Sequence, residues 1–199
     1  NLSEDGVVIS GHNRGQICVF SLENFKLIRK YKEHTQTVWD VKSYIKSKFL
    51  SASSDYTIKI WDLESTDSLR TIKYECTCFY IEPLFNFNLS YLAISCYDRR
   101  VHIYNVTTDK KLDNFLSDTA NVAQRILFLS KIRPFNLILT INYNKIKLWN
   151  LETMMQINEF EGHKGWVYGI NYIDNDLFCT SGDDRSIRLW NVHQKKAVK

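Results

Sequence analysis

The sequence predicts an all-β fold built from repeated units, and two observations lead to this prediction. The segment Glu33–Leu63 returns at Gly162–Val192 in register and without a gap. Aromatic anchors that end similar segments follow one another at intervals of about 40 to 45 residues, which is the repeat length of one blade of a β-propeller. These anchors are Phe20, Trp61, Tyr104, Trp149 and Trp190. The predicted fold class is therefore an all-β propeller.

Strand-like alternation supports this fold class within the units. In the segments 57–61 and 186–190, apolar side chains occupy one face, while Lys59 and Arg188 lie on the other with their long aliphatic stems. β-branched and aromatic residues are enriched, and no apolar stripe with the helical period extends beyond a turn or two. The sequence therefore predicts strands and no long helix.

The first strand of the best-preserved unit carries a break in its alternation. Val38 and Val41 are both apolar although they are three residues apart. A β-bulge, which inserts one extra residue into one strand of an antiparallel pair, produces such a break. We therefore expect a bulge that redirects Thr37 and Trp39, and the unit 162–199 repeats the feature.

The repeats divide one predicted domain, residues 1–199, into five units. Their approximate bounds are 1–32, 33–75, 76–117, 118–161 and 162–199. The first unit has no room for an innermost strand, and the last stops where its fourth strand is due. The two ends therefore duplicate rather than complement one another, and a propeller loses its exposed sheet edges only by full closure. We expect about four full blades plus a partial one, in an open arc or fragment of a larger ring such as one of seven blades, with residues missing on both sides.

The composition is that of an ordinary globular protein, with 44% hydrophobic residues, 24% charged residues and a net charge of +4. No apolar run approaches the roughly 20 residues of a membrane-spanning helix, and no signal-peptide pattern opens the sequence. Lysines and arginines are scattered along the chain. The charge therefore permits nucleic-acid binding without indicating it.

The five cysteines are odd in number and sit mostly inside apolar strand-like runs. This usage suits free buried thiols in a reducing compartment and predicts a cytoplasmic or nuclear location. Cys76 and Cys78 would share one strand face, but no second cysteine or histidine pair supplies the remaining ligands of a metal site. No metal and no cofactor are therefore expected.

Three recurring motifs indicate the kind of repeat. A Trp-Asp dipeptide stands at 61–62 and becomes Trp-Asn at 149–150 and 190–191. A histidine follows Gly162 and Glu33. A turn aspartate precedes the anchor by six residues in three units, as Asp55, Asp98 and Asp184. These motifs resemble those of the WD40-repeat family, and the resemblance implies a β-propeller while leaving the activity open, because one fold hosts many functions.

Two sets of residues have the chemistry of a nucleophile, a base and an orienting carboxylate. They are His34, Ser51 and Asp55, and their counterparts His163, Thr180 and Asp184. The resemblance implies that these sets, completed by Trp61 and Trp190, are instead structural tetrads. In each tetrad Asp would orient His, His would meet the hydroxyl, and the hydroxyl would meet the indole N–H, which satisfies buried polar groups. An active site would not need duplication in register, so no catalytic residue and no enzyme activity are expected.

The resemblance places a third group of residues on the top face, around the central channel, where partners dock. These residues flank the bulged valine or precede the turn aspartate. The candidate partner-binding residues are Thr37, Trp39, Ser54, Tyr97, Trp166, Tyr168 and Asp183, together with Arg14 in place of a turn aspartate. Exposed aromatic residues are the usual binding anchors. The alternative for Trp39 and Tyr168 is packing between blades.

The predicted function is a non-catalytic scaffold that binds a peptide or protein partner on the top face within a multiprotein complex. One alternative is the substrate-receptor module of a ubiquitin ligase, and another is an RNA-binding propeller of ribosome biogenesis. A receptor for phosphorylated motifs would need several arginines at the channel mouth. Arg14 is the best candidate found, which weakens that version.

Overall fold

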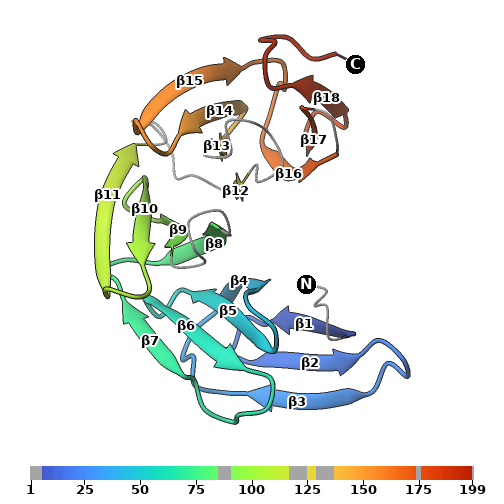
Figure 1. Cartoon of the computed structure of the whole chain (residues 1–199). Coiled ribbons are helices and arrows are strands. Elements are labelled where there is room, and N and C mark those ends of the chain that lie inside the picture. Colours follow the sequence, from blue (N-terminus) through green and yellow to red (C-terminus); the bar gives the residue numbers. More distant parts are fainter. Residues whose placement is uncertain (1–5, 85–90, 117–124, 129–136, 174–175, 199) are drawn as a thin grey trace. The chain divides into compact units, whose positions relative to one another are not determined.

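The computed structural model describes residues 6–84, 91–116, 125–128, 137–173 and 176–198. Over these residues the chain forms eighteen strands and no helix (Figure 1). The same residues accordingly contain no helical segment that could cross a membrane. The contacts divide the chain into two compact units, Asn1–Pro83 and Leu84–Lys199, and each is described by itself below.

The first unit contains two antiparallel sheets (Figure 1). The first sheet has the order β1-β2-β3, with β1 (Val7–Gly11), β2 (Ile17–Ser21) and β3 (Leu27–Tyr31). The second has the order β4-β5-β6-β7, with β4 (Val38–Ser43), β5 (Lys48–Ser53), β6 (Thr57–Asp62) and β7 (Arg70–Lys73). Strand β8 (Cys78–Leu84) then carries the chain into the second unit.

The second unit contains the strands that follow Pro83, which complete the remaining sheets. Strands β9 (Tyr91–Cys96), β10 (Arg100–Asn105) and β11 (Lys110–Leu116) form the sheet β11-β10-β9-β8. The next sheet, β12-β13-β14-β15, is made of β12 (Arg125–Phe128), β13 (Leu137–Asn142), β14 (Lys145–Asn150) and β15 (Met155–Phe160). The last sheet, β16-β17-β18, is made of β16 (Val167–Tyr172), β17 (Leu177–Gly182) and β18 (Ile187–Asn191).

These sheets confirm the all-β repeat predicted from the sequence. The first and last sheets each have three strands, which is the strand content predicted for the two end units. At the C-terminal side, the Val198 backbone N–H donates to Leu189 O at 2.7 Å, where the stub of a fourth strand was expected. The predicted bulges are also confirmed, because the pairing register shifts between Val38 and Asp40 in β4 and between Val167 and Gly169 in β16.

A recurring tight turn connects the second and third strands of three sheets. In each, the turn aspartate accepts a hydrogen bond from the backbone N–H two residues later, as Thr57 N–H does to Asp55 Oδ1 at 3.1 Å. Asp98 and Asp184 make the same bond at 3.1 and 3.2 Å. This side-chain capture is the reason why aspartate suits such turns. The residue after the aspartate takes a left-handed backbone conformation, with φ of 67° at Tyr56.

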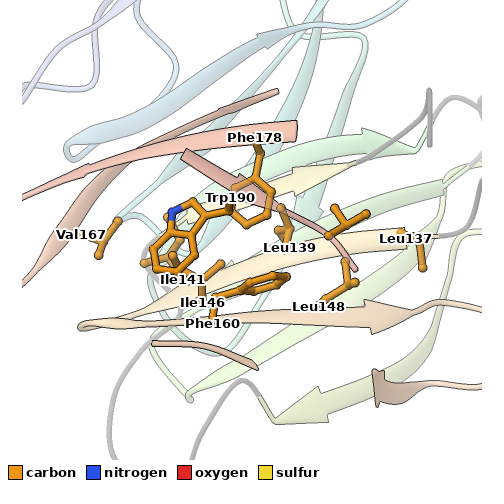
Figure 2. Packing of buried hydrophobic residues seen from close by; sticks show 10 residues of the cluster. Leu137, Leu139, Ile141, Ile146, Leu148, Phe160, Val167, Phe178 and Trp190 are labelled. Atoms are coloured by element: carbon orange, nitrogen blue, oxygen red, sulfur yellow. The ribbon is translucent and has the colours of Figure 1, made fainter. Parts of the chain in front are cut away.

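The core lies between neighbouring sheets, and one aromatic arrangement appears in both units. In the first unit, Trp61 stacks on Phe49 at a ring-centroid distance of 6.0 Å. In the second, Trp190 stacks on Phe178 at 6.2 Å. Figure 2 shows this indole among apolar side chains of the preceding sheet, with Phe160 close to it. Each tryptophan is fully buried, so the anchors of the repeat fill the space between two blades.

Candidate functional site

The first tetrad joins four side chains of the second sheet. His34 Nδ1 lies 2.7 Å from Asp55 Oδ2, and His34 Nε2 lies 2.7 Å from Ser51 Oγ. The Trp61 indole N–H donates to the same Ser51 oxygen at 2.8 Å. The structure therefore brings all four residues into one hydrogen-bonded chain that runs from the turn to the core.

The second tetrad repeats this geometry in the last sheet. His163 Nδ1 lies 2.9 Å from Asp184 Oδ1, and His163 Nε2 lies 2.8 Å from Thr180 Oγ1. The Trp190 indole N–H donates to Thr180 Oγ1 at 2.7 Å. Threonine thus replaces serine without a change in the bonding pattern.

One arrangement of protons satisfies every polar atom in the chain of bonds. An ionised Asp55 can only accept, so His34 donates from Nδ1 and accepts at Nε2. Ser51 then donates to His34 and accepts from the indole of Trp61. His34 is 3% exposed and Ser51 is 0% exposed. A substrate has no access to the Ser51 hydroxyl, so the trio lacks what a hydrolytic nucleophile needs.

The turn aspartates of both tetrads are held in the ionised form. Burial would raise the pKa of Asp55, but hydrogen bonds from His34 and Thr57 outweigh it and hold that pKa well below its usual range. The hydrogen bond from Ser186 is the leading cause of the lowered pKa of Asp184. At neutral pH the negative charges of Asp55 and Asp184 therefore strengthen hydrogen bonds within the protein.

Two partial tetrads lie in the second unit, and the sequence reasoning missed both. His102 on β10 approaches Asp98 with Nε2 at 2.9 Å from Oδ2, although no histidine precedes that sheet's first strand at the usual place. The Trp149 indole donates to Thr140 Oγ1 at 2.9 Å, without an aspartate in the turn. The sequence did contain a sign of the second partial tetrad. Thr140 lies nine residues before Trp149, close to the ten residues that separate Thr180 from Trp190.

A partly buried polar cluster surrounds Glu33, which occupies the position of Gly162 in the other repeat. Its carboxylate accepts from Lys59 Nζ at 2.8 Å and from the Ser68 backbone N–H and hydroxyl, both at 2.6 Å. Lys59 also donates to Thr71 Oγ1 at 2.8 Å. The cluster therefore ties the segment before β4 to the outer strand β7 of the same sheet.

We expect the stability of the protein to fall on acidification as this carboxylate is protonated. Burial raises the pKa of Glu33, but the bonds from Lys59 and Ser68 lower it to about 2, below the ordinary value of 4.5. The folded state thus binds fewer protons than the unfolded state in this range. The contribution of the ionised Glu33 carboxylate to the stability of the fold is complete above pH 4.5 and is lost as the pH falls toward 2.

Urea midpoints measured between pH 7 and 3 check this expectation. The Glu33→Gln variant should be less stable at pH 7 and should lose less of its remaining stability on acidification than the native chain. An identical acid slope for both proteins would show that the Glu33 cluster contributes nothing to the pH dependence.

The first aromatic patch, made of Thr37, Trp39, Ser54 and Phe79, lies beside the β4 bulge in the first unit. The Trp39 indole donates to Ser54 Oγ at 2.7 Å, and its ring meets Phe79 edge to face at 5.4 Å. Trp39 nevertheless keeps 48% of its surface exposed. Thr37 Oγ1 donates to Asn13 O at 3.2 Å. The patch is therefore both fixed in place and open to solvent.

The second aromatic patch, made of Tyr143, Trp166, Tyr168 and Asp183, lies beside the β16 bulge in the second unit. Tyr143 and Trp166 meet edge to face at 5.0 Å, with their rings 89° apart. The Asp183 backbone N–H donates to Trp166 O at 2.8 Å. A Cβ at Gly165 would lie 2.9 Å from the Asp183 Cβ, so glycine is needed for this close approach. Tyr143 was not among the predicted site residues.

The two patches share an interaction between equivalent positions. The Trp39 indole donates to the Ser54 hydroxyl, and the Asp183 carboxylate acts on the Tyr168 hydroxyl. Partial burial and then the bond to Asp183, together with its negative charge, raise the pKa of Tyr168, so its hydroxyl is a proton donor at neutral pH. In both repeats, the residue after the bulged valine is thus tied to the residue before the turn aspartate.

The two remaining predicted residues lie in exposed turns. Tyr97 is 66% exposed between β9 and β10, immediately before Asp98. Arg14 is exposed between β1 and β2, next to the Asn13 carbonyl that binds Thr37. Each lies at a strand-connecting turn rather than in an enclosed site.

Comparisons with known proteins identify the kind of repeat and the fold. The WD40 family model (WD domain, G-beta repeat) matches residues 25–62 and 154–191. The chain contains WD40 repeats at both places. The solved WD40 beta propeller domain of Doa1 superposes with a TM-score of 0.82 at 18% identity, over 99% of this chain and 64% of that chain. The WD40 chain therefore has the β-propeller fold.

Several curated proteins are similar to the WD40 chain. Human apoptotic protease-activating factor 1 is 24% identical over 92% of this chain and 14% of that protein. Pre-mRNA-processing factor 19 homolog 2 of Arabidopsis thaliana is 21% identical over 100% of this chain and 38% of its own length. The E3 ubiquitin-protein ligase COP1 of Pisum sativum is 22% identical over 96% of this chain and 22% of that protein. The WD40 chain thus spans less than half the length of each.

Proposed function

We propose that this WD40 chain is a non-catalytic scaffold that binds a peptide or protein partner through its exposed aromatic patches, within a multiprotein complex. The observation that carries the proposal is the half-exposed state of aromatic side chains held at the β4 and β16 bulges. Trp39, Trp166 and Tyr168 are 48%, 36% and 55% exposed. Ordered aromatic side chains at a surface supply binding energy at a low cost in conformational entropy.

The internal bonding of the tetrads supports a function without catalysis. His34, Ser51 and Asp55 bond to one another, and Ser51 and His34 are inaccessible. Trp39, which takes no part in the tetrad and belongs to the same repeat, reaches solvent instead. Stability and partner binding are therefore assigned to different residues of the same repeat.

Capture of partners by immobilised variants tests the proposal. We expect Trp166→Ala and Tyr97→Ala to lose a protein that the native chain captures, while both variants keep the native far-UV circular dichroism. Ile157→Ala is the matched control, because Ile157 is an exposed apolar residue on the outer strand β15. Loss of the captured protein by the control, or its retention by both aromatic variants, would contradict the assignment of binding to the predicted residues.

The substrate-receptor role in a ubiquitin ligase remains a narrower version of this proposal, and the similarity to COP1 favours it. The captured proteins would then include ligase subunits. The alternative of RNA binding predicts an affinity that falls steeply with salt concentration. For the compartment, all five cysteines are free thiols, which supports a cytoplasmic or nuclear location.

A further inference from the structure

Two adjacent carboxylates in the β17–β18 turn have different surroundings. Asp184 binds His163 at 2.9 Å and lies 3.5 Å from Arg188 Nη2, so its charge is compensated inside the chain. Asp183 is exposed, and its negative charge contributes to the raised pKa of the neighbouring Tyr168 hydroxyl, which burial raises first. Over the residues that the structure describes, no ion pair involves Asp183. The negative charge of Asp183 is therefore left facing solvent.

The uncompensated carboxylate lies within an aromatic setting. The backbone of Asp183 bonds that of Trp166, whose ring is perpendicular to Tyr143 at 5.0 Å. Its carboxylate also acts electrostatically on the Tyr168 hydroxyl. Tyr143 and Trp166 are each 36% exposed, so their rings remain accessible. Aromatic faces attract cations through the ring quadrupole, and a carboxylate adds a charge-assisted hydrogen bond.

We propose that the second aromatic patch, Tyr143, Trp166, Tyr168 and Asp183, binds a basic side chain, arginine or lysine, of a partner peptide. This inference rests on the proposed scaffold function and names the chemistry of the group that the patch recognises. The first aromatic patch has its ring contact at Trp39 instead, and it places the neutral Ser54 where Asp183 stands. It therefore offers aromatic contact without the charge.

The net charge of the whole chain does not attract a basic side chain, so the local groups of the patch must supply the attraction. The net charge of the chain is +4, which disfavours the accumulation of cations over its surface as a whole. A basic side chain would therefore be drawn by Asp183 and the surrounding rings rather than by the general field. An acidic or neutral side chain at this place would leave the carboxylate unpaired.

Titration with single amino-acid amides, followed by NMR of the indole N–H groups, tests the proposal. The probes are N-acetyl-arginine amide, N-acetyl-lysine amide and the neutral isostere N-acetyl-citrulline amide, and Trp166→Phe assigns the reporter signal. We expect a saturable shift of the Trp166 indole with at least one basic probe, and binding of citrulline at least about threefold weaker than that of arginine. Asp183→Asn should weaken the basic probe by about two- to fivefold.

A matched control variant makes the outcome decisive. Asp176→Asn removes another partly exposed carboxylate of the same unit, one that pairs with His193, and should leave the titration unchanged. The inference is overturned if neither basic probe shifts the Trp166 signal, if citrulline binds as well as arginine, or if Asp183→Asn binds as the native chain does.

This inference and the scaffold function can fail separately. Loss of a captured protein by Trp166→Ala without binding of the basic probes would leave the scaffold function standing and remove the cationic ligand. If the native chain binds the basic probes while Trp166→Ala and Tyr97→Ala still capture the protein, the cationic ligand stands and the assignment of scaffold binding to these residues is removed.

Discussion

Replacing Trp61 by alanine is expected to lower the free energy of unfolding by about 3 to 5 kcal/mol, the usual range for emptying a large buried aromatic site. Trp61 is 0% exposed and stacks on Phe49. It also meets Tyr31 of the preceding sheet edge to face at 5.1 Å. The substitution leaves a cavity between two sheets and removes the donor to Ser51, so packing and hydrogen bonding are lost together. Urea unfolding followed by far-UV circular dichroism measures the effect.

The matched control for this substitution is Trp39→Ala. The same residue type is removed from the same sheet, but Trp39 is 48% exposed and leaves no enclosed cavity. We expect a loss of about 1 kcal/mol, in the range for an exposed side chain with one aromatic contact. Equal losses for both variants would show that the first aromatic patch is part of the core rather than a binding surface.

Removing the central hydroxyl of a tetrad is the second change with a large expected effect. In Ser51→Ala, the His34 Nε2 and Trp61 Nε1 atoms lose their common partner in a site with no solvent. Buried polar groups without partners cost about 1 to 3 kcal/mol each, so the expected loss for the two groups is about 2 to 6 kcal/mol. The same urea titration measures it.

The chain itself supplies the control for the hydroxyl. Thr180 occupies the equivalent position and makes the same two bonds, so Ser51→Thr should retain most of the stability that Ser51→Ala loses. In a Trp61→Phe background, the cost of Ser51→Ala should shrink, because the indole donor is already absent. A Ser51→Thr variant as unstable as Ser51→Ala would point to packing rather than hydrogen bonding.

Much of the fold could be predicted because its periodicities are local. Alternation within each strand, the spacing of the aromatic anchors and the turn aspartates each report a physical requirement of a short segment. The bulge followed from Val38 and Val41 alone, since both must face the core although they are three residues apart. The residues around the bulge could be named for the same reason.

Features that depend on contacts between distant segments could not be predicted in the same way. Glu33 departs from the glycine of the other repeat, and its role depends on Lys59 and Ser68, which only the folded sheet brings to it. Tyr143 belongs to a turn without the usual aspartate, and its contact with Trp166 joins two neighbouring sheets. The sequence of neither segment indicates the contact between Tyr143 and Trp166.

The bulged strands have a consequence for how such a chain can diversify. The pairing register shifts beside Val38 and Val167 and both valines are buried, whereas Trp39, Trp166 and Tyr168 next to them are exposed. Substitutions at the flanking positions can therefore re-specify the ligand while the scaffold stays intact. Grafting the Tyr168–Asp183 pair onto positions 39 and 54 would transplant a recognition chemistry from one blade to another.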